Sequence, residues 1–217
     1  MDKNHVAYYY SVPEIVMERG ERIYLWDIEG NRYYDMLGGF ASLSQGHCHP
    51  KIAEAMYAQA KKLTMSSRSL MNDVMPDTSK FVCDFLGYEQ FLAASSGVEA
   101  CEGAVKLARK WGYVVKGIEE DRADIILANG CFWGRSISAS GNCSDPMRGK
   151  HFGPHTPGFP LVPFDDLVAL EYQLQNNPNV SAVMLEPIQG EAGTIVPEDG
   201  FLKRVHDLTR KYDCLLI

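Results

Sequence analysis

The sequence predicts an α/β protein whose mainly parallel sheet is flanked by helices. Two runs, 123–128 (ADIILA) and 180–185 (VSAVML), are nearly continuous in apolar residues, as are strands that are buried on both faces of a parallel sheet. Segments with helical periodicity lie before, between and after them, and this alternation is typical of parallel α/β folds. The 217 residues, of which 46% are hydrophobic and 23% charged, suffice for one large domain or two small ones.

The first 87 residues are predicted to form short strands followed by helices. Residues 22–37 alternate in character around Glu29-Gly30-Asn31, which indicates two short strands joined by a turn. Apolar residues at helical spacing then predict helices near 51–63 and 77–87.

A strand, a turn and a helix are expected around residue 95. The apolar run 91–94 precedes Ser95-Ser96-Gly97, and an apolar stripe with helical spacing continues from there to Gly112. This layout points free backbone N–H groups and the positive end of a helix at an anion. The alternative is that the serine and glycine simply cap the helix.

Two further loops follow the apolar runs, at 129–136 (NGCFWGRS) and 186–193 (EPIQGEAG). Helices are predicted near 165–175 and 199–212, and the latter leads into Leu215-Leu216-Ile217. Sites in such sheets lie beyond the carboxyl ends of the strands, so all three loops are candidates for one site. The sequence has neither the G-x-G-x-x-G nor the G-x-x-x-x-G-K-[ST] pattern, which disfavours a Rossmann dinucleotide site and a P-loop.

The charge distribution excludes several classes of partner. The net charge is −7 and there is no basic block, which argues against a nucleic acid or an anionic membrane as partner. No apolar run approaches the roughly 20 residues that span a bilayer. The N-terminus, MDKNHVAYYY, resembles neither a signal peptide nor a transit peptide. We therefore expect the cytoplasm, or the mitochondrial matrix if a transit peptide has been removed.

The cysteines predict reduced thiols rather than disulfides or a metal site. The six cysteines are widely spaced and form no C-x-x-C pair. Cys131, Cys143, His151 and His155 resemble a zinc-ligand series, but eleven residues separate the two cysteines, whereas a zinc finger has about two to four. Three consecutive side chains such as His47-Cys48-His49 cannot all face one ion, so no metal is expected.

A set of segments, in their order and spacing, resembles one enzyme family. The segments are YSVPEIVMERGERIYLWDIEGNRYYDML, QGHCHPKI, SSGVEA, KLARKWGY, FWGRS, FGPHTPGF and VMLEPIQGEAGTIVPEDG. They are similar to those of ornithine δ-aminotransferases, pyridoxal 5′-phosphate (PLP) enzymes of the class III transaminase group, over nearly the whole chain. The resemblance implies a fold type I PLP-dependent transferase.

The same resemblance implies a domain layout. Residues 1–45 would form an N-terminal segment with short strands, and residues 46–217 part of the large PLP-binding domain. The chain ends at Leu215-Leu216-Ile217, which looks like the first half of a buried strand. We therefore expect the chain to be truncated.

The resemblance also implies which residues bind the cofactor. These are Ser96, Gly97, Val98, Phe132, Trp133 and Glu186. The first three would hold the PLP phosphate through a hydroxyl and backbone N–H groups. Phe132 would stack on the pyridine ring and Trp133 would flank the substrate pocket, although composition alone favours core packing for both aromatic residues. The family's Asn-Thr-Gly turn is replaced here by Ser95-Ser96-Gly97, which keeps a hydroxyl.

Four residues are implied to contact the substrate. Arg135 would pair with a substrate carboxylate, for which its planar fork is suited. Glu191 matches the glutamate that pairs with a C-terminal arginine outside this sequence and helps the site to switch between diamines and dicarboxylates. Tyr10 falls near a substrate-contacting tyrosine. Phe40 replaces a tyrosine, and loss of its hydroxyl would cost about 1–3 kcal/mol of selectivity.

No catalytic residue is assigned within the chain. The family's Schiff-base lysine and the aspartate at the pyridine nitrogen would come after Ile217, and none of the eleven lysines matches that lysine. Without it, this segment alone should not transaminate.

The resemblance implies a transamination for the whole enzyme. It would transfer the δ-amino group of L-ornithine to 2-oxoglutarate, giving glutamate-5-semialdehyde and glutamate. Its partners would be amino-acid and oxo-acid substrates and a second copy of itself, in a homodimer or higher homo-oligomer. The alternatives are a class III transaminase for N-acetylornithine or 4-aminobutyrate, or a catalytically dead protein that binds or regulates a partner.

Overall fold

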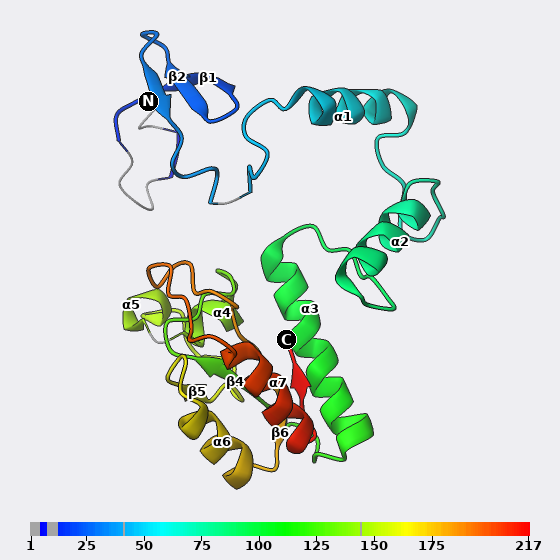
Figure 1. Cartoon of the computed structure of the whole chain (residues 1–217), viewed down its shortest axis with the longest axis vertical. Helices are drawn as coiled ribbons and strands as arrows, with labels where there is room; N and C mark the ends of the chain where they lie inside the picture. Colours follow the sequence, from blue (N-terminus) through cyan, green and yellow to red (C-terminus); the bar gives the residue numbers. More distant parts are fainter. Residues whose placement is uncertain (1–4, 8–12, 41, 144) are drawn as a thin grey trace. The chain divides into compact units, whose positions relative to one another are not determined.

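A computed structural model describes residues 5–7, 13–40, 42–143 and 145–217. Tyr10 lies outside these residues. Contacts divide the chain into two units, residues 1–90 and 91–217 (Figure 1). Each unit is treated by itself, and the domain boundary after residue 45 stays a prediction.

Unit 1 begins with a three-stranded antiparallel sheet. Its strands, in the order β1-β2-β3, are β1 (Met17–Glu21), β2 (Tyr24–Asp27) and β3 (Arg32–Tyr34). The predicted turn joins β2 to β3. There the buried Asp27 carboxylate accepts hydrogen bonds from Asn31 and from the Tyr33 hydroxyl, at 2.8–3.0 Å. These bonds, chiefly the one from the Asn31 side chain, hold the pKa of Asp27 below its usual value.

Two helices complete unit 1, as the periodicity predicts. They are α1 (Pro50–Lys62) and α2 (Met75–Leu86), each with a proline in its first turn, where no backbone donor is needed. Gly87 ends α2 in the left-handed conformation, with φ of 74°. Neither helix has a buried residue, and the rings of Phe81 and Phe85 stack on each other at 6.0 Å.

Unit 2 contains a four-stranded sheet in the order β5-β4-β6-β7, in which every neighbouring pair is parallel. The strands are β4 (Asp124–Ala128), β5 (Leu161–Val162), β6 (Val180–Val183) and β7 (Leu215–Leu216). The helices are α3 (Gly97–Trp111), the π-helical turn η1 (Gly112–Lys116), α4 (Ile137–Gly141), α5 (Pro146–Gly149), α6 (Leu167–Asn176) and α7 (Phe201–Lys211). The predicted fold class is confirmed.

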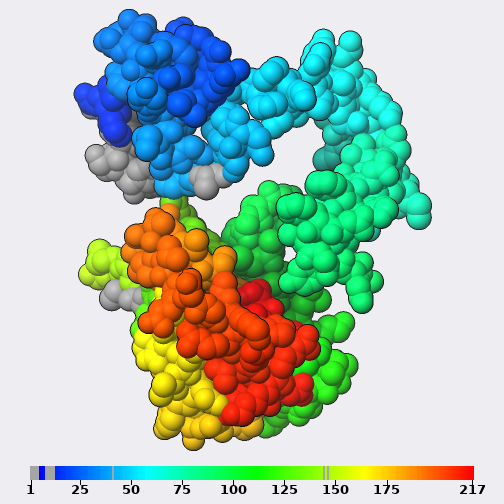
Figure 2. All heavy atoms as spheres, viewed as in Figure 1, coloured from blue at the N-terminus to red at the C-terminus, as the bar shows by residue number. Residues whose placement is uncertain are grey.

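Helices cover both faces of this sheet because side chains alternate along its strands. Ile125 packs with Val105 and Ala108 of α3 on one face. Ile126 packs on the other face with Leu170 of α6 and Val205 of α7. Figure 2 shows the yellow atoms of α6 beside the orange-red atoms of α7.

The structure differs from the prediction mainly at short elements. The run 91–94 is exposed and forms no strand, since no neighbouring strand in the described part of the chain offers it hydrogen bonds. Strands β1 and β5 and helices α4 and α5 were not predicted. Elements of two to five residues carry too little periodicity to be recognised.

Several features bear on the expected partners. All six cysteines are free thiols. Within the described ranges, no three or more His, Cys, Asp or Glu side chains gather closely enough to hold a metal ion. No helix among the same residues has the length and apolar character needed to cross a bilayer.

Substituting Gly112→Ala will destabilise unit 2, because Gly112 lets η1 approach β6. A Cβ there would lie 2.9 Å from Cβ of the buried Ser181 and 3.2 Å from Cδ1 of Ile118. Such overpacking costs about 1–3 kcal/mol of unfolding free energy, measurable by urea denaturation. Gly103→Ala is the matched control, since a Cβ at Gly103 has nothing within 4 Å and helix propensity favours alanine by about 1 kcal/mol. Equal stability of the two variants would contradict this packing.

Candidate active site

Three segments meet at the carboxyl edge of the sheet in unit 2. One is the loop 129–136 after β4, and another is the loop 184–193 after β6. Because β4 and β6 are parallel neighbours, both loops leave the sheet at the same edge. The third is the start of α3, whose Val98 lies against Gly134 of the first loop.

The start of α3 is a capped helix end with free donors. The Ser96 hydroxyl accepts a hydrogen bond from the Glu99 N–H at 3.3 Å, and the Glu99 carboxylate accepts one from the Ser95 N–H at 2.8 Å. This is a reciprocal capping arrangement. The N–H groups of Gly97 and Val98 have no acceptor among the described residues, and the Ser96 hydroxyl still has its proton to donate.

The loop after β4 is fastened to α3 at two points. A Cβ on Gly134, which has φ of 144°, would lie 2.3 Å from Cγ2 of Val98, so only glycine permits this approach. The Ser136 hydroxyl donates to the Glu102 carboxylate at 2.5 Å. These contacts hold the aromatic pair Phe132-Trp133 next to the helix start.

Glu186 joins the two loops. Its carboxylate accepts one hydrogen bond from the N–H of Phe132, at 3.0 Å, and another from the N–H of Gly190, at 3.2 Å. One oxygen thus binds the loop after β4 and the other binds the loop after β6. The Glu186 side chain therefore positions Phe132 and also places a negative charge in the site.

Gln189 is a second link that sequence reasoning missed. It is 1% exposed, and its Nε2 donates to the Asn129 carbonyl oxygen at 2.7 Å. Its backbone pairs with Ile195 on the way back toward α7. In the sequence, only the place of Gln189 within EPIQGE pointed to this role. Composition did not indicate it, because glutamine seldom occurs fully buried.

The two aromatic residues take different positions. The ring of Phe132 is half-buried, whereas Trp133 is buried in the cluster beneath α3 and packs against Phe159 with ring centroids 5.5 Å apart. This position of Trp133 agrees with the core-packing alternative. Its place beside a substrate pocket stays a prediction.

Among the charged residues of the site, Arg148 and Glu191 form an ion pair, whereas Arg135 is exposed. Nη2 of Arg148 lies 3.4 Å from the Glu191 carboxylate, and its guanidinium lies 5.3 Å from the centre of the Phe132 ring. Sequence reasoning missed Arg148, because its contacts are separated by many residues in the chain. The Arg135 guanidinium is exposed and has no ion pair or hydrogen bond within the described part of the chain.

The thiols of this region are not activated. Burial raises the pKa of Cys131, which precedes Phe132, to about 11, and burial also raises the pKa of Cys101 on α3. Both remain protonated near neutral pH and are poor nucleophiles.

The structure does not place two of the predicted site residues relative to this group. Phe40 belongs to unit 1, where it is exposed and has φ of 54°. Tyr10 lies outside the described residues.

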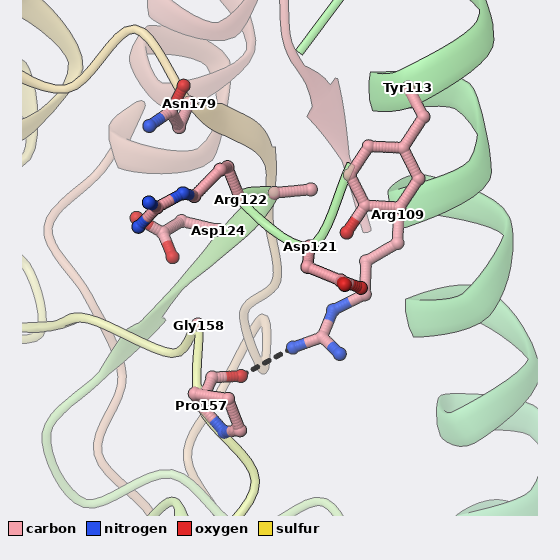
Figure 3. A pocket seen from close by; sticks show the side chains of 9 residues that line it. Arg109, Tyr113, Asp121, Arg122, Asp124, Pro157, Gly158 and Asn179 are labelled. Atoms are coloured by element: carbon pink, nitrogen blue, oxygen red, sulfur yellow. Dashed lines mark hydrogen bonds between the residues drawn. The ribbon is translucent and has the colours of Figure 1, made fainter. Parts of the chain in front are cut away.

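A separate pocket of about 390 Å³ lies at the opposite, amino edge of the sheet (Figure 3). Asp124 begins β4, and Gly158 and Asn179 come just before β5 and β6. Arg109 donates from its Nη2 to the Pro157 carbonyl oxygen at 2.5 Å, as the dashed line shows. The two arginines and two aspartates of the lining cancel in charge, and parallel α/β sheets carry their sites at the other edge, so the carboxyl edge is the better candidate.

The chain is similar to known proteins both in sequence and in structure. The family profile described as "Aminotransferase class-III" matches residues 6–217. The mitochondrial ornithine aminotransferase of Rattus norvegicus is 47% identical over 216 residues, which are 100% of this chain and 49% of the relative.

Two solved structures are also similar. An ornithine aminotransferase from Toxoplasma gondii, with partial occupancy of PLP at its active site, has a TM-score of 0.95 and 45% identity, covering 99% of this chain and 50% of that one. An acetylornithine aminotransferase from Elizabethkingia anophelis has a TM-score of 0.84 and 40% identity, covering 99% and 50%. This chain thus spans about half the length of the relatives it matches.

Substituting Glu186→Gln will loosen the link between the two loops. The amide can accept from only one of the two N–H groups and turns its NH₂ toward the other. Losing one such bond costs about 1 kcal/mol, which is roughly a fivefold change in an opening equilibrium. Hydrogen exchange should accelerate by that factor at whichever of the two amides, Phe132 or Gly190, loses its acceptor. Glu198→Gln, in the connection before α7, is the control, and equal exchange in both variants would refute the link.

Proposed function

The chain belongs to the class-III aminotransferase family, and on this premise we propose that it supplies cofactor- and substrate-binding residues to an ornithine aminotransferase. The whole protein would transfer the δ-amino group of L-ornithine to 2-oxoglutarate, yielding glutamate-5-semialdehyde and glutamate. The observation that carries the proposal is the meeting of three segments at one sheet edge, through the Gly134–Val98 and Phe132–Glu186 contacts. Ornithine specificity is further supported by the rat and Toxoplasma gondii relatives.

The cofactor we propose is PLP, and the residues at this edge fit it. When bound, PLP takes up and releases the amino group, because its conjugated ring acts as an electron sink. The open donors at the start of α3 suit a phosphate, and the half-buried ring of Phe132 suits a flat aromatic ring. No lysine of this chain is assigned a catalytic role.

The phosphate would be held mainly by backbone groups. The N–H groups of Gly97 and Val98 point out of the first turn of α3, and the positive helix end favours an anion there. The Ser96 hydroxyl keeps its bond to Glu99 while donating its own proton to a phosphate oxygen. The position of a Cβ on Gly97 has no atom within 4 Å, so an anion has room to approach.

The ring would be positioned by Phe132. Glu186 fixes the Phe132 backbone, and Gly134 keeps the same loop against Val98. A phosphate at the helix start and a ring beside Phe132 would therefore be fixed relative to each other. This orientation, rather than any acid or base in the chain, is the contribution that these residues make.

The substrate would be bound by charged groups on the same loops. Arg135 is proposed to hold a carboxylate with its exposed guanidinium. Glu191 is proposed to contact the substrate end that carries positive charge. Trp133, Phe40 and Tyr10 are retained as proposed site residues on the strength of the family resemblance alone.

The assembly and the compartment are also proposed from the relatives and the surface. Met56 of α1 and Phe81 of α2 are exposed, which supports burial against another subunit in a homodimer or higher homo-oligomer. The name of the rat relative includes "mitochondrial". This favours a mitochondrial location over the cytoplasm that the N-terminus alone predicts.

Substituting Gly97→Ala will weaken PLP binding without destabilising the fold. The added methyl group occupies the open space beside the two N–H donors, so a phosphate can no longer approach them closely. The dissociation constant of PLP, measured by fluorescence titration of the cofactor-free natural protein, should rise at least about tenfold, equivalent to about 1.4 kcal/mol. Gly103→Ala, in the middle of the same helix, should bind PLP like the wild type. Equal PLP affinity of both variants would remove α3 from the site.

The natural protein should prefer L-ornithine as amino donor, and Phe40→Tyr should strengthen that preference. We expect kcat/KM for ornithine to exceed the values for N-acetylornithine and 4-aminobutyrate, with 2-oxoglutarate as acceptor. A restored hydroxyl is worth about 1–3 kcal/mol, or roughly 5- to 150-fold in the ratio of kcat/KM values. A higher kcat/KM for either competing donor would refute the ornithine assignment, and a complete lack of transamination would favour a binding or regulatory protein.

A further inference from the structure

The His47 side chain joins the two ends of the loop that carries Phe40. Its Nε2 lies 2.6 Å from one carboxylate oxygen of Asp35. The other oxygen accepts hydrogen bonds from the N–H groups of Leu37 and Gly38, at 3.0 and 2.9 Å. The Gly38 N–H and the His47 side chain hold the pKa of Asp35 below its usual value, so the carboxylate is ionised at neutral pH. An ionised carboxylate can only accept, and His47 Nε2 is therefore the donor.

Both partners of this hydrogen bond are attached to the β1–β2 hairpin of unit 1. The N–H of Asp35 donates to the Ile23 carbonyl oxygen at 2.8 Å, and the backbone of His47 exchanges two hydrogen bonds with Arg22, at 2.7 and 2.9 Å. The His47 ring lies against Gly20 of β1, where a Cβ would be 2.7 Å from Cγ of the ring, so only glycine permits this contact. The ring is thus fixed on the hairpin, and it fixes the carboxylate at the start of the loop.

The loop between Asp35 and His47 has an unusual backbone conformation. Gly38, Gly39 and Phe40 have φ of 55°, 58° and 54°. This left-handed region is open to glycine but unfavourable for phenylalanine, so it persists only where surrounding contacts impose it. The Phe40 side chain is 66% exposed, and its own packing contributes little to that constraint. The attachment of the loop at its two ends therefore has to supply much of it.

We propose that His47 is a positioning residue, which through Asp35 holds Phe40 in the conformation that contacts the amino donor. In this inference, which rests on the proposed function, His47 acts on the substrate only through these two residues. The side chains of His47 and Asp35 are 19% and 10% exposed, so water competes little for their hydrogen bond. The first histidine of QGHCHPKI thereby has a role, although the proposed function makes no other use of that segment.

Hydrogen exchange in the natural protein tests the attachment of the loop independently of activity. His47→Leu removes the donor to Asp35 but keeps a side chain of similar size against Gly20. Loss of one such bond shifts an opening equilibrium about fivefold. The amides of Gly38 and of Leu43, which donates to the Gly38 carbonyl oxygen at 3.0 Å, should therefore exchange about fivefold faster. His47→Gln, whose amide can still donate to the carboxylate, should restore most of the protection, and unchanged exchange in His47→Leu would overturn the inference.

A double-mutant cycle in the natural, PLP-loaded protein tests whether His47 acts through Phe40. Phe40→Ala and His47→Leu should each lower kcat/KM for L-ornithine, the latter about fivefold. In the Phe40→Ala background, His47→Leu should have no further effect, because the ring that it positions is gone. A purely structural residue would lower kcat/KM by the same factor in both backgrounds, and this additivity would contradict the inference. Wild-type kinetics of Phe40→Ala would contradict it as well.

The matched control is His206→Leu, which makes the same replacement at a histidine of α7 whose side chain is 52% exposed. It should leave the exchange rates in unit 1 and kcat/KM for L-ornithine at the wild-type values. Absence of ornithine transamination in the wild type would refute the proposed function and with it the role of Phe40. The exchange rates would still show in that case whether His47 holds the loop.

Discussion

The carboxylate of Glu186 is the contact on which the candidate site depends. It accepts the N–H of Phe132 from the loop after β4 and the N–H of Gly190 from the loop after β6. Each loop is long enough to adopt other conformations, and neither is fixed by the sheet alone. The two acceptor oxygens of this one side chain therefore hold the loops after two neighbouring strands together. The start of α3 packs against the first of these loops, where Val98 contacts Gly134.

The sequence was sufficient to predict the buried strands and the longer helices, because their apolar residues follow a regular spacing. The buried strands β4 and β6 stood out as apolar runs because both faces of the sheet are covered, by α3 on one side and by α6 and α7 on the other. The longer helices were recognised from their apolar stripes. The run 91–94 looked like a strand for the same reason as β4, but in the described residues no strand pairs with it, and an apolar run alone does not specify a partner.

The candidate-site residues that were named from the sequence lie in short segments that match family motifs. Ser96, Gly97 and Val98 share one turn, and Phe132 shares its loop with Arg135. Arg148 and Gln189 were missed because their partners, Glu191 and Asn129, are 43 and 60 residues away. Trp133 shows the reverse case, in which a residue of a recognised motif lies in the core beneath α3.

A crystal structure of the natural protein grown with PLP would test the central claim most directly, since it locates the cofactor. We predict the phosphate within hydrogen-bond distance of the Ser96 hydroxyl and the N–H groups of Gly97 and Val98, with the pyridine ring against Phe132. Cofactor density elsewhere, for example in the pocket at the amino edge beside Arg109, would contradict the assignment of the carboxyl edge as the active site.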